Sequence, residues 1–227
     1  MTGACITPEL FRFFEELAAH NDRGWFEANR TRYENAVRGP LLRFIADFEE
    51  PLDGISPYMV ADPRRSGGSL FRIHRDTRFS RDKSPYKTSA GIQFRHEVGR
   101  NVHGPSFYLH LAPDLVFAGA GCWHPDGPAL RRIREAIGDD PEAWTDVRAR
   151  VDEAGLAFEG ESLKRIPRGF DADHPLAGDL KRKDFVVTRT LDRETVCTEG
   201  FLDTFAAICR SASPLPAFLA GALELPW

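Results

Sequence analysis

The sequence contains no hydrophobic run long enough to span a bilayer. Its longest apolar stretch, residues 215–223, falls well short of the roughly 20 residues that a transmembrane helix needs. The first residues also lack the basic and apolar regions of a secretory signal peptide. The hydrophobic share of 42% is ordinary for a soluble globular protein. Because both kinds of segment are missing, we expect a cytoplasmic protein without a membrane partner.

Cysteine is scarce, and its pattern excludes two common uses. The four cysteines (5, 122, 197 and 209) form no CxxC pair, so neither a zinc ribbon nor a disulfide framework is indicated. The histidines show no metal-ligand spacing, and the glycine-rich fingerprints of dinucleotide-binding and P-loop proteins are absent. The sequence therefore predicts no cofactor, and a metal site assembled by the fold has no support in it.

The chain also lacks an excess of positive charge. Its 30 lysines and arginines face 34 aspartates and glutamates, which gives a formal net charge of −4. Such a balance produces no global positive field and argues against indiscriminate nucleic-acid binding. Any anion-binding site must therefore be local.

Lysine is the scarcest charged residue, and its placement is uneven. Two lysines fall within residues 78–87, and the other three fall within residues 163–185. Lysine carries a compact, hydrated ammonium whose pKa moves on burial, whereas the arginine guanidinium is flat and permanently charged. Confinement of lysine to two stretches indicates positions where arginine cannot replace lysine. Such positions are expected in a functional site.

The first fifty residues have the pattern of a helical layer. Thr7 and Pro8 are typical of a helix start, and apolar residues follow at helical spacing. Asp22 is placed to cap a second helix, and Gly39 with Pro40 is expected to restart a third.

Alternating apolar residues predict the strands. They lie at residues 88–94, 107–111 and 115–120, with further candidates at 156–158 and 185–190. Short connections between the first three indicate an antiparallel meander.

Helices are expected to begin at Asp126, Asp140 and Thr198, and a last short helix covers residues 214–223. Because helices bracket a mostly antiparallel sheet, the predicted fold class is α+β, with residues 1–227 as a single domain. Its parts are a helical layer (about 7–52), the sheet with a basic loop (about 55–122), and further helices with a second basic loop (about 126–227).

The first basic loop, residues 72–88, is the strongest candidate site. Its candidate ligand-binding residues are Arg72, Arg75, Arg78, Arg81, Lys83 and Lys87, opposed only by Asp76 and Asp82. One interpretation is an anion pocket, since arginines bind phosphate or carboxylate with two donors and lysines add point charges.

Tyr86 and Lys87 are also candidate proton-transfer residues if burial lowers the pKa of the lysine. The other interpretation is an ion-pair network that pins the loop to the sheet. Both stay open.

The second basic loop, residues 164–183, adds Lys164, Arg168 and Lys183 as candidate ligand-binding residues. His174 beside Asp173 is a candidate general base or metal ligand, although a lone histidine is more often a surface or capping residue.

Small residues precede Trp123 and His124 at a predicted strand-to-helix turn, residues 119–126. This turn could offer backbone N–H groups to an anion, or its glycines could allow close packing beneath Trp123. Cys122 has no base beside it, so a thiol nucleophile is not indicated.

Four motifs resemble the family called "domain of unknown function 2461". They are FxFFxxL with NDRxWFxxNR within residues 11–30, FRIxRDTRFSxDKSPYKT at 71–88, GxWxPD at 121–126 and KRxPRGFDxDHP at 164–175. The resemblance covers nearly the whole chain and implies a single full-length domain, but no activity. It also draws attention to Asn21, Arg23, Trp25, Asn29 and Arg30, as a second wall of the site or as residues that cap and pack a helix.

The leading hypothesis is an anion pocket built from residues 72–88 and lined further by residues 164–183. Its ligand would be a phosphorylated small molecule, a nucleotide or a nucleic-acid end. Phosphoester cleavage or group transfer would suit such a pocket, with Tyr86, His74 or His174 as acid or base. The alternatives are a non-catalytic module whose basic loop docks an acidic partner, and a charge network that only stabilises the fold. The two loops form one cleft only if the strands that follow them place them together.

Overall fold

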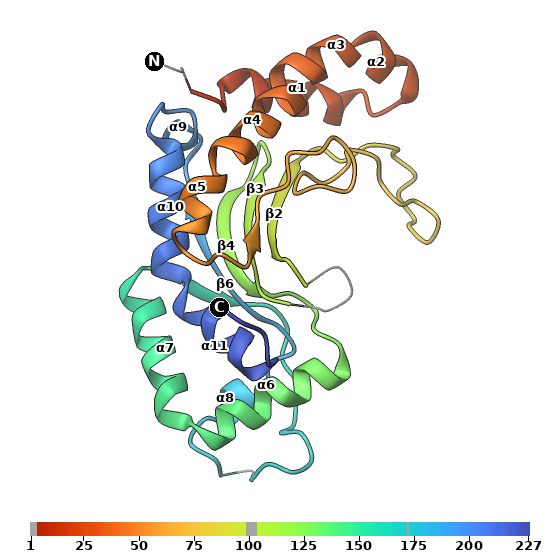
Figure 1. Cartoon of the computed structure of the whole chain (residues 1–227). Coiled ribbons are helices and arrows are strands. Elements are labelled where there is room, and N and C mark those ends of the chain that lie inside the picture. Colours follow the sequence, from red (N-terminus) through yellow and green to blue (C-terminus); the bar gives the residue numbers. More distant parts are fainter. Residues whose placement is uncertain (1–3, 99–103, 172) are drawn as a thin grey trace.

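One antiparallel sheet of six strands organises the chain. The structure is a computed structural model that describes residues 4–98, 104–171 and 173–227 (Figure 1). The strands are β1 Met59–Val60, β2 Ala90–His96, β3 Ser106–Leu111, β4 Val116–Cys122, β5 Ala157–Glu159 and β6 Phe185–Leu191, in the spatial order β1-β2-β3-β4-β6-β5. The predicted meander is β2-β3-β4, and the predicted single α+β domain is confirmed.

Helices before the sheet form the expected N-terminal layer. They are α1 Pro8–Ala19, α2 Arg23–Ala28, α3 Arg30–Tyr33, a π-helical turn η1 Glu34–Arg38, α4 Gly39–Asp47 and α5 Glu49–Asp53. The side chain of Asp22 accepts a hydrogen bond from the backbone N–H of Trp25, so the predicted cap is confirmed. Helix α1 begins at Pro8, also as expected.

Helix α4 begins at Gly39 with Pro40 in its first turn, as predicted, but no break separates it from the preceding helix. The helix continues through both residues by way of η1, in which the N–H of Gly39 bonds the carbonyl of Glu34. A Cβ at position 39 would lie 2.8 Å from that carbonyl oxygen, so the close approach requires glycine. Proline has no N–H to donate, so one helical hydrogen bond is missing at Pro40. The π turn directly before it already changes the bonding pattern from i→i−4 to i→i−5, so the helix tolerates this loss.

The remaining helices are α6 Gly127–Asp139, α7 Pro141–Glu153, α8 Ala177–Leu180, α9 Arg193–Val196, α10 Phe201–Ala212 and α11 Pro214–Ala222. Asp126 and Asp140 cap α6 and α7 as predicted. Thr198 does not cap α10, which follows Gly200. Its hydroxyl instead donates to the carbonyl of Thr195.

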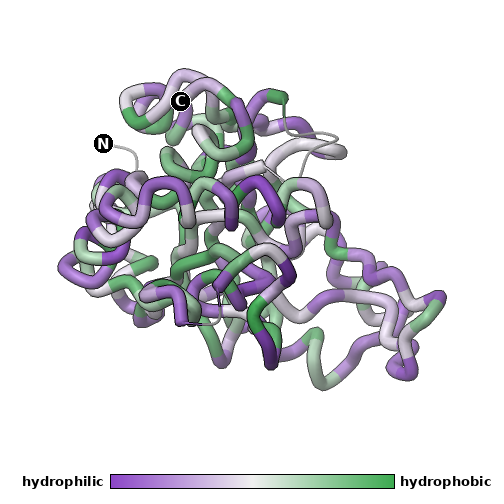
Figure 2. The backbone as a smooth tube through the Cα atoms, turned by 90° about the horizontal axis from the view of Figure 1, so that it is seen from below, coloured by the Kyte–Doolittle hydropathy of each residue, from purple (hydrophilic) through white to green (hydrophobic). Residues whose placement is uncertain are grey.

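The core lies between the helices and one face of the sheet. Phe94 of β2 contacts Phe48 and Phe205, with ring centroids 4.7 and 5.9 Å apart. Phe185 of β6 meets Trp144 of α7 edge to face at 5.8 Å. Each such ring, fully buried, contributes roughly 2–3 kcal/mol of stability. Figure 2 shows the apolar segments gathered towards the centre of the molecule, while the segment that projects furthest is mostly hydrophilic.

Candidate functional site

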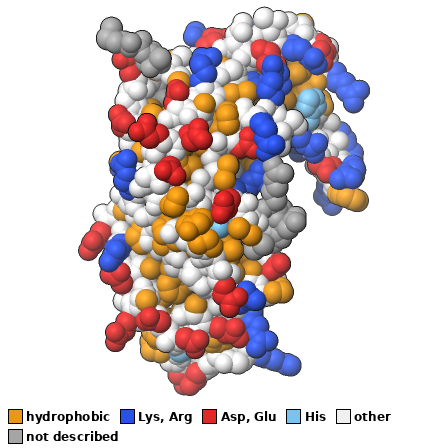
Figure 3. All heavy atoms as spheres, in the orientation of Figure 1, with side chains coloured by type: hydrophobic (Ala, Val, Ile, Leu, Met, Phe, Trp, Pro, Cys, Tyr) orange, Lys and Arg blue, Asp and Glu red, His pale blue; other side chains and the backbone are white. Residues whose placement is uncertain are grey.

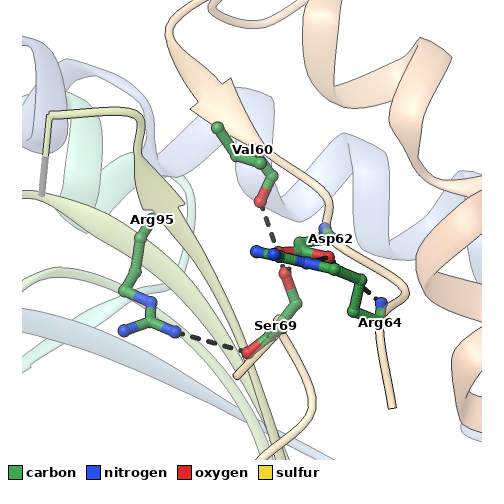
Figure 4. A network of polar contacts seen from close by, with 6 residues as sticks. Val60, Asp62, Arg64, Ser69 and Arg95 are labelled. Atoms are coloured by element: carbon green, nitrogen blue, oxygen red, sulfur yellow. Dashed lines mark hydrogen bonds and ion pairs between the residues drawn. The ribbon is translucent and has the colours of Figure 1, made fainter. Parts of the chain in front are cut away.

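The chain that leads into the first basic loop is fixed to the edge of the sheet (Figure 4). The hydroxyl of Ser69 accepts from the N–H of Asp62 at 3.0 Å and donates to the carbonyl of Val60 at 3.4 Å. Arg95 of β2 donates to the carbonyl of Gly68 at 3.3 Å. The base of the loop is thereby tied to β1 and β2.

The far end of the first basic loop is fixed to the helical layer. The side-chain amide of Asn21 donates to the carbonyl of Tyr86 at 3.0 Å, and its oxygen accepts from the N–H of Tyr86 at 3.1 Å. The ring of Tyr86 is buried and stacks on Phe26. This burial raises the pKa of Tyr86, so near neutral pH the hydroxyl keeps its proton. Asn21 thus anchors the first basic loop to the helical layer, and it is not among the residues that line the cavities described below.

Several predicted ligand-binding residues are bonded within the loop itself. Arg75 pairs with Asp82, and Arg78 pairs with Asp76 at 2.7 Å. Lys83 donates to the carbonyl of Thr77 at 2.9 Å. Exposed pairs of this kind contribute about 0–1 kcal/mol each, so they shape the loop more than they stabilise the protein.

Arg72 and Lys87 differ from these residues. In the described part of the chain, neither side chain forms an ion pair with a carboxylate. The ammonium of Lys87 is partly buried and lies 5.3 Å from the ring centroid of Phe71. Burial, with a smaller effect from the nearby charge of Arg72, lowers the pKa of Lys87. Two cations therefore lie near one another without an ion pair in the described part of the chain, and Asp76 acts on Arg72 only from a longer distance.

A small cavity of about 150 Å³ lies where the helical layer meets the first basic loop. We call it the arginine pocket. It is lined by Phe26, Arg30, Tyr33, Glu34, Arg38, Arg65, Leu70, Phe71, Arg72, Ile73 and His74. Four guanidinium groups face one carboxylate, that of Glu34, which bonds Arg38 at 2.8 Å and Arg65 at 2.7 Å. In Figure 3 basic side chains gather over this part of the molecule.

Sequence reasoning missed Arg38 and Arg65 as site residues. They come from η1 and from the loop after β1, outside both lysine-bearing stretches. Arg30 was noticed through the family motif, and it pairs with Glu27 at 2.7 Å. The sequence alone could not identify these two arginines, because their position beside the first basic loop depends on how the helical layer packs against that loop.

A larger cavity of about 680 Å³ lies on the sheet, and we call it the open-face cavity. It is lined by Phe71, Gln93, Ser106, Tyr108, His110, Leu115, Phe117, Gly119, Ala120, Gly121, Trp123, Glu159, Val186, Val187, Thr188 and Thr190. Phe71 lines this cavity and the arginine pocket alike. Burial lowers the pKa of His110 and raises that of Tyr108, so both side chains are neutral near neutral pH.

The turn at residues 119–126 contributes His124 to a histidine–aspartate pair with Asp184. The imidazole Nδ1 of His124 lies 2.9 Å from the carboxylate of Asp184, which is completely buried. The same carboxylate accepts from the backbone N–H groups of His124 and Glu161. His124 has a positive φ of 50°, an uncommon conformation for a residue with a side chain. Asp184 therefore ties together β6, the turn after β4 and the end of β5.

The glycines of this turn allow close packing. Gly121 has φ 123°, and a Cβ there would lie 2.0 Å from the carbonyl oxygen of Phe185. This favours the packing interpretation of the turn, in which glycine lets β4 approach β6.

The second basic loop lies away from the first. Across the sheet, Ala90 at the start of β2 stands in one row with Leu191 at the end of β6. Phe185, at the start of β6, is at the opposite end. The loops that precede these two strands therefore lie at opposite ends of the sheet and form no common cleft (Figure 1).

Within the second basic loop the candidate residues are scattered. Lys183 pairs with Glu161 at 2.8 Å, while Lys164 and Arg168 are exposed. The ring nitrogen Nδ1 of His174 accepts from the N–H of Leu176 at 3.0 Å, which is a capping contact. Among the residues that the structure describes, no cluster of histidine, cysteine, aspartate or glutamate has the geometry of a metal site.

A family model described as "Conserved hypothetical protein (DUF2461)" matches residues 9–218. The chain belongs to the DUF2461 family. The match confirms the resemblance seen in the sequence, and the DUF2461 span includes every residue that lines the arginine pocket and the open-face cavity. No curated protein matches the chain. Among the described segments of this DUF2461 protein, no helix has both the length and the apolar character needed to cross a bilayer.

Proposed function

We propose that this protein binds a phosphate-bearing ligand, such as a nucleotide or a nucleic-acid end, through the arginine pocket. The observation that carries the proposal is a pair of neighbouring cations that form no ion pair in the described part of the chain: Arg72, which lines the pocket, and Lys87, which lies beside it against Phe71. An anion placed between them would offset the repulsion that their closeness creates. Guanidinium groups supply paired donors that match phosphate geometry, and a lysine adds a point charge.

The neighbouring residues support the same ligand. Arg30, Arg38 and Arg65 add three guanidinium groups around the cavity, and Glu34 is the single carboxylate among its described lining residues. A volume of about 150 Å³ suits a phosphate group and not a whole nucleotide, so the rest of the ligand would extend outside.

If the ligand reacts, His74 is the acid or base that the geometry favours. It lines the arginine pocket, and its ring lies 5.2 Å from that of Tyr86. His174 belongs to the second basic loop at the other end of the sheet, so it takes no part in this version of the proposal. Positive charge around a phosphoester stabilises the charge that develops during cleavage or transfer.

A second candidate function rests on the tip of the first basic loop. The side chain of Phe79 is 95% exposed and lies between Arg78 and Arg81 in the sequence. An exposed aromatic residue among basic residues suits docking to an acidic partner. Such docking would weaken when Phe79 is changed to Ser, whereas phosphate binding would not.

A thermal-shift screen tests the main proposal. Inorganic phosphate, nucleotides, oligonucleotides and divalent metals are compared on the wild-type protein and on Lys87→Met. We expect phosphate-bearing compounds to raise the Tm of the wild type and to lose most of this effect in the variant. If no phosphate compound raises the Tm, the proposal fails.

We include a cytoplasmic location in the proposal, supported by four cysteines that form no disulfide in the described segments.

A further inference from the structure

The open-face cavity has features that the phosphate proposal does not use. Along the central row of the sheet, Tyr108 of β3 and Thr188 of β6 both pair with Gly119 of β4. Because glycine has no side chain, the row has a gap between the tyrosine and the threonine. Gly121 leaves a second gap, between Ser106 and Val186 in the next row. The floor of the cavity is therefore bare backbone between two raised edges.

Aromatic rings surround this floor. Tyr108 lies 6.0 Å from Phe71 and 5.8 Å from Phe117, measured between ring centroids. His110 stacks on Phe117 at 4.9 Å. Trp123 comes from the turn after β4, and 57% of its surface is exposed. Large apolar side chains exposed around a hollow indicate a binding site.

The polar lining residues restrict the charge of an occupant. Of the described residues that line the cavity, Glu159 is the single charged one. His110 and Tyr108 are held neutral by burial, and their side chains lie 3.3 Å apart. Gln93, Thr188 and Thr190 offer uncharged hydrogen-bonding groups. An anion would face the carboxylate of Glu159 here, and no lysine or arginine is among the described lining residues, so a ligand without negative charge fits this lining.

The size separates a small molecule from a protein partner. Small-molecule sites are concave and measure roughly 300–1,000 Å³, and this cavity holds about 680 Å³. A protein partner needs an extended patch of roughly 800 Å² on each side, and such patches are flatter than a ring-walled hollow.

We propose that the open-face cavity is a second binding site, distinct from the arginine pocket, for a planar aromatic small molecule that carries no negative charge. The molecule lies on the glycine floor between Tyr108 and Thr188, and Phe71 and Trp123 close the two ends. Its polar edge meets the uncharged hydrogen-bonding groups of Gln93 and His110.

The test uses a neutral fluorescent probe, N-phenyl-1-naphthylamine, and variants that fill the cavity. Thr188→Phe places a ring where the probe would lie, and Thr190→Phe, on an exposed residue of the same lining, is an independent second variant. Thr145→Phe, on the exposed surface of α7, is the matched control. We expect the two cavity variants to weaken the dissociation constant of the probe roughly tenfold or more, a loss of about 1.4 kcal/mol, and the control to leave it unchanged.

Two further measurements locate the probe and test its charge. Quenching of tryptophan emission by the probe should fall in Trp123→Phe, because Trp123 lines the cavity. The anionic analogue 8-anilinonaphthalene-1-sulfonate should bind the wild type more weakly than the neutral probe at any site that Thr188→Phe blocks. Arg72→Gln should leave binding of the neutral probe unchanged. Probe binding and phosphate binding can therefore succeed or fail independently.

Two results would overturn the inference. One is an unchanged probe affinity in both Thr188→Phe and Thr190→Phe. The other is a wild-type dimer in sedimentation that either variant converts to a monomer, which would show that a second copy of the chain covers this face.

Discussion

Tyr86 of the first basic loop stacks on Phe26 of α2, with ring centroids 4.1 Å apart and the planes inclined by only 22°. This contact joins two segments far apart in the sequence, and Asn21 reinforces it by bonding both backbone polar groups of Tyr86. The loop is thereby held against the helical layer, which brings Arg72 to the arginines of η1 and α3. The candidate site therefore depends on two anchoring residues, Asn21 and Tyr86, that do not line the arginine pocket themselves.

Removing this anchor should destabilise the protein. Asn21→Ala leaves the N–H and carbonyl of the buried Tyr86 without partners, and an unsatisfied buried group costs about 1–3 kcal/mol. We expect a loss of this size in the free energy of urea unfolding. Asn35→Ala, at an exposed position of η1, is the control and should change stability by less than about 0.5 kcal/mol. Equal effects of the two substitutions would contradict the anchoring role.

The His124–Asp184 pair should prove to be a structural joint of the sheet. Asp184→Ala deprives two backbone N–H groups and one imidazole of their acceptor, so we expect a loss of about 3 kcal/mol or more. Asp184→Asn keeps one acceptor oxygen and should cost less. Denaturant unfolding gives the comparison, with the exposed Asp203→Ala as control. A loss no greater than that of the control would show that the joint contributes little.

Lys87 should make stability depend on pH in the alkaline range. Burial and the charge of Arg72 lower its pKa in the folded protein, whereas an unfolded lysine titrates near about 10.4. Between these two values the unfolded chain binds more protons than the folded one, so stability attributable to Lys87 rises with pH across that window. Below the lowered pKa, the folded protein carries the full penalty of a partly buried charge.

Comparison of variants isolates this effect from other alkaline titrations. As the pH rises from the lowered pKa of Lys87 towards its unfolded value, the unfolding free energy of the wild type should increase relative to that of Lys87→Met. Lys83→Met, in the same loop but at an exposed position, is the matched control for loss of a lysine. Phosphate affinity should fall over the same range, because the proposed site loses a positive charge. A pH-independent difference for Lys87→Met would mean that this lysine is not perturbed by its surroundings.

Local features of the fold were predictable from the sequence because they depend on neighbouring residues. Asp22, Asp126 and Asp140 each cap the helix that follows, and the cap requires only a side chain three residues before an N–H group. Alternation likewise revealed the meander, since one face of each strand packs on the core. Gly39 and Pro40 marked the start of α4, but they did not indicate the π turn that joins it to the preceding helix without a break.

The candidate site was predictable only in part, because it depends on pairing between distant segments. The two lysine-bearing loops both precede strands, but β2 and β6 run in opposite directions, which places the loops at opposite ends of the sheet. Arg38 and Arg65 reach the arginine pocket from separate segments, and His124 is 60 residues from Asp184. The lysine pattern directed attention to Lys87, which stays a candidate, whereas Arg75 and Arg78 are paired within their own loop.

The most direct test of the account is calorimetric titration of inorganic phosphate into the wild type, Arg72→Gln and Arg78→Gln. Both arginines are exposed and belong to the first basic loop, but only Arg72 lines the arginine pocket. We expect Arg72→Gln to weaken phosphate binding by roughly 10- to 100-fold, as loss of a charged hydrogen bond of about 1.5–3 kcal/mol requires, and Arg78→Gln to bind as the wild type does. Equal affinities of the wild type and Arg72→Gln, or an equal loss in both variants, would contradict the arginine pocket as the phosphate site.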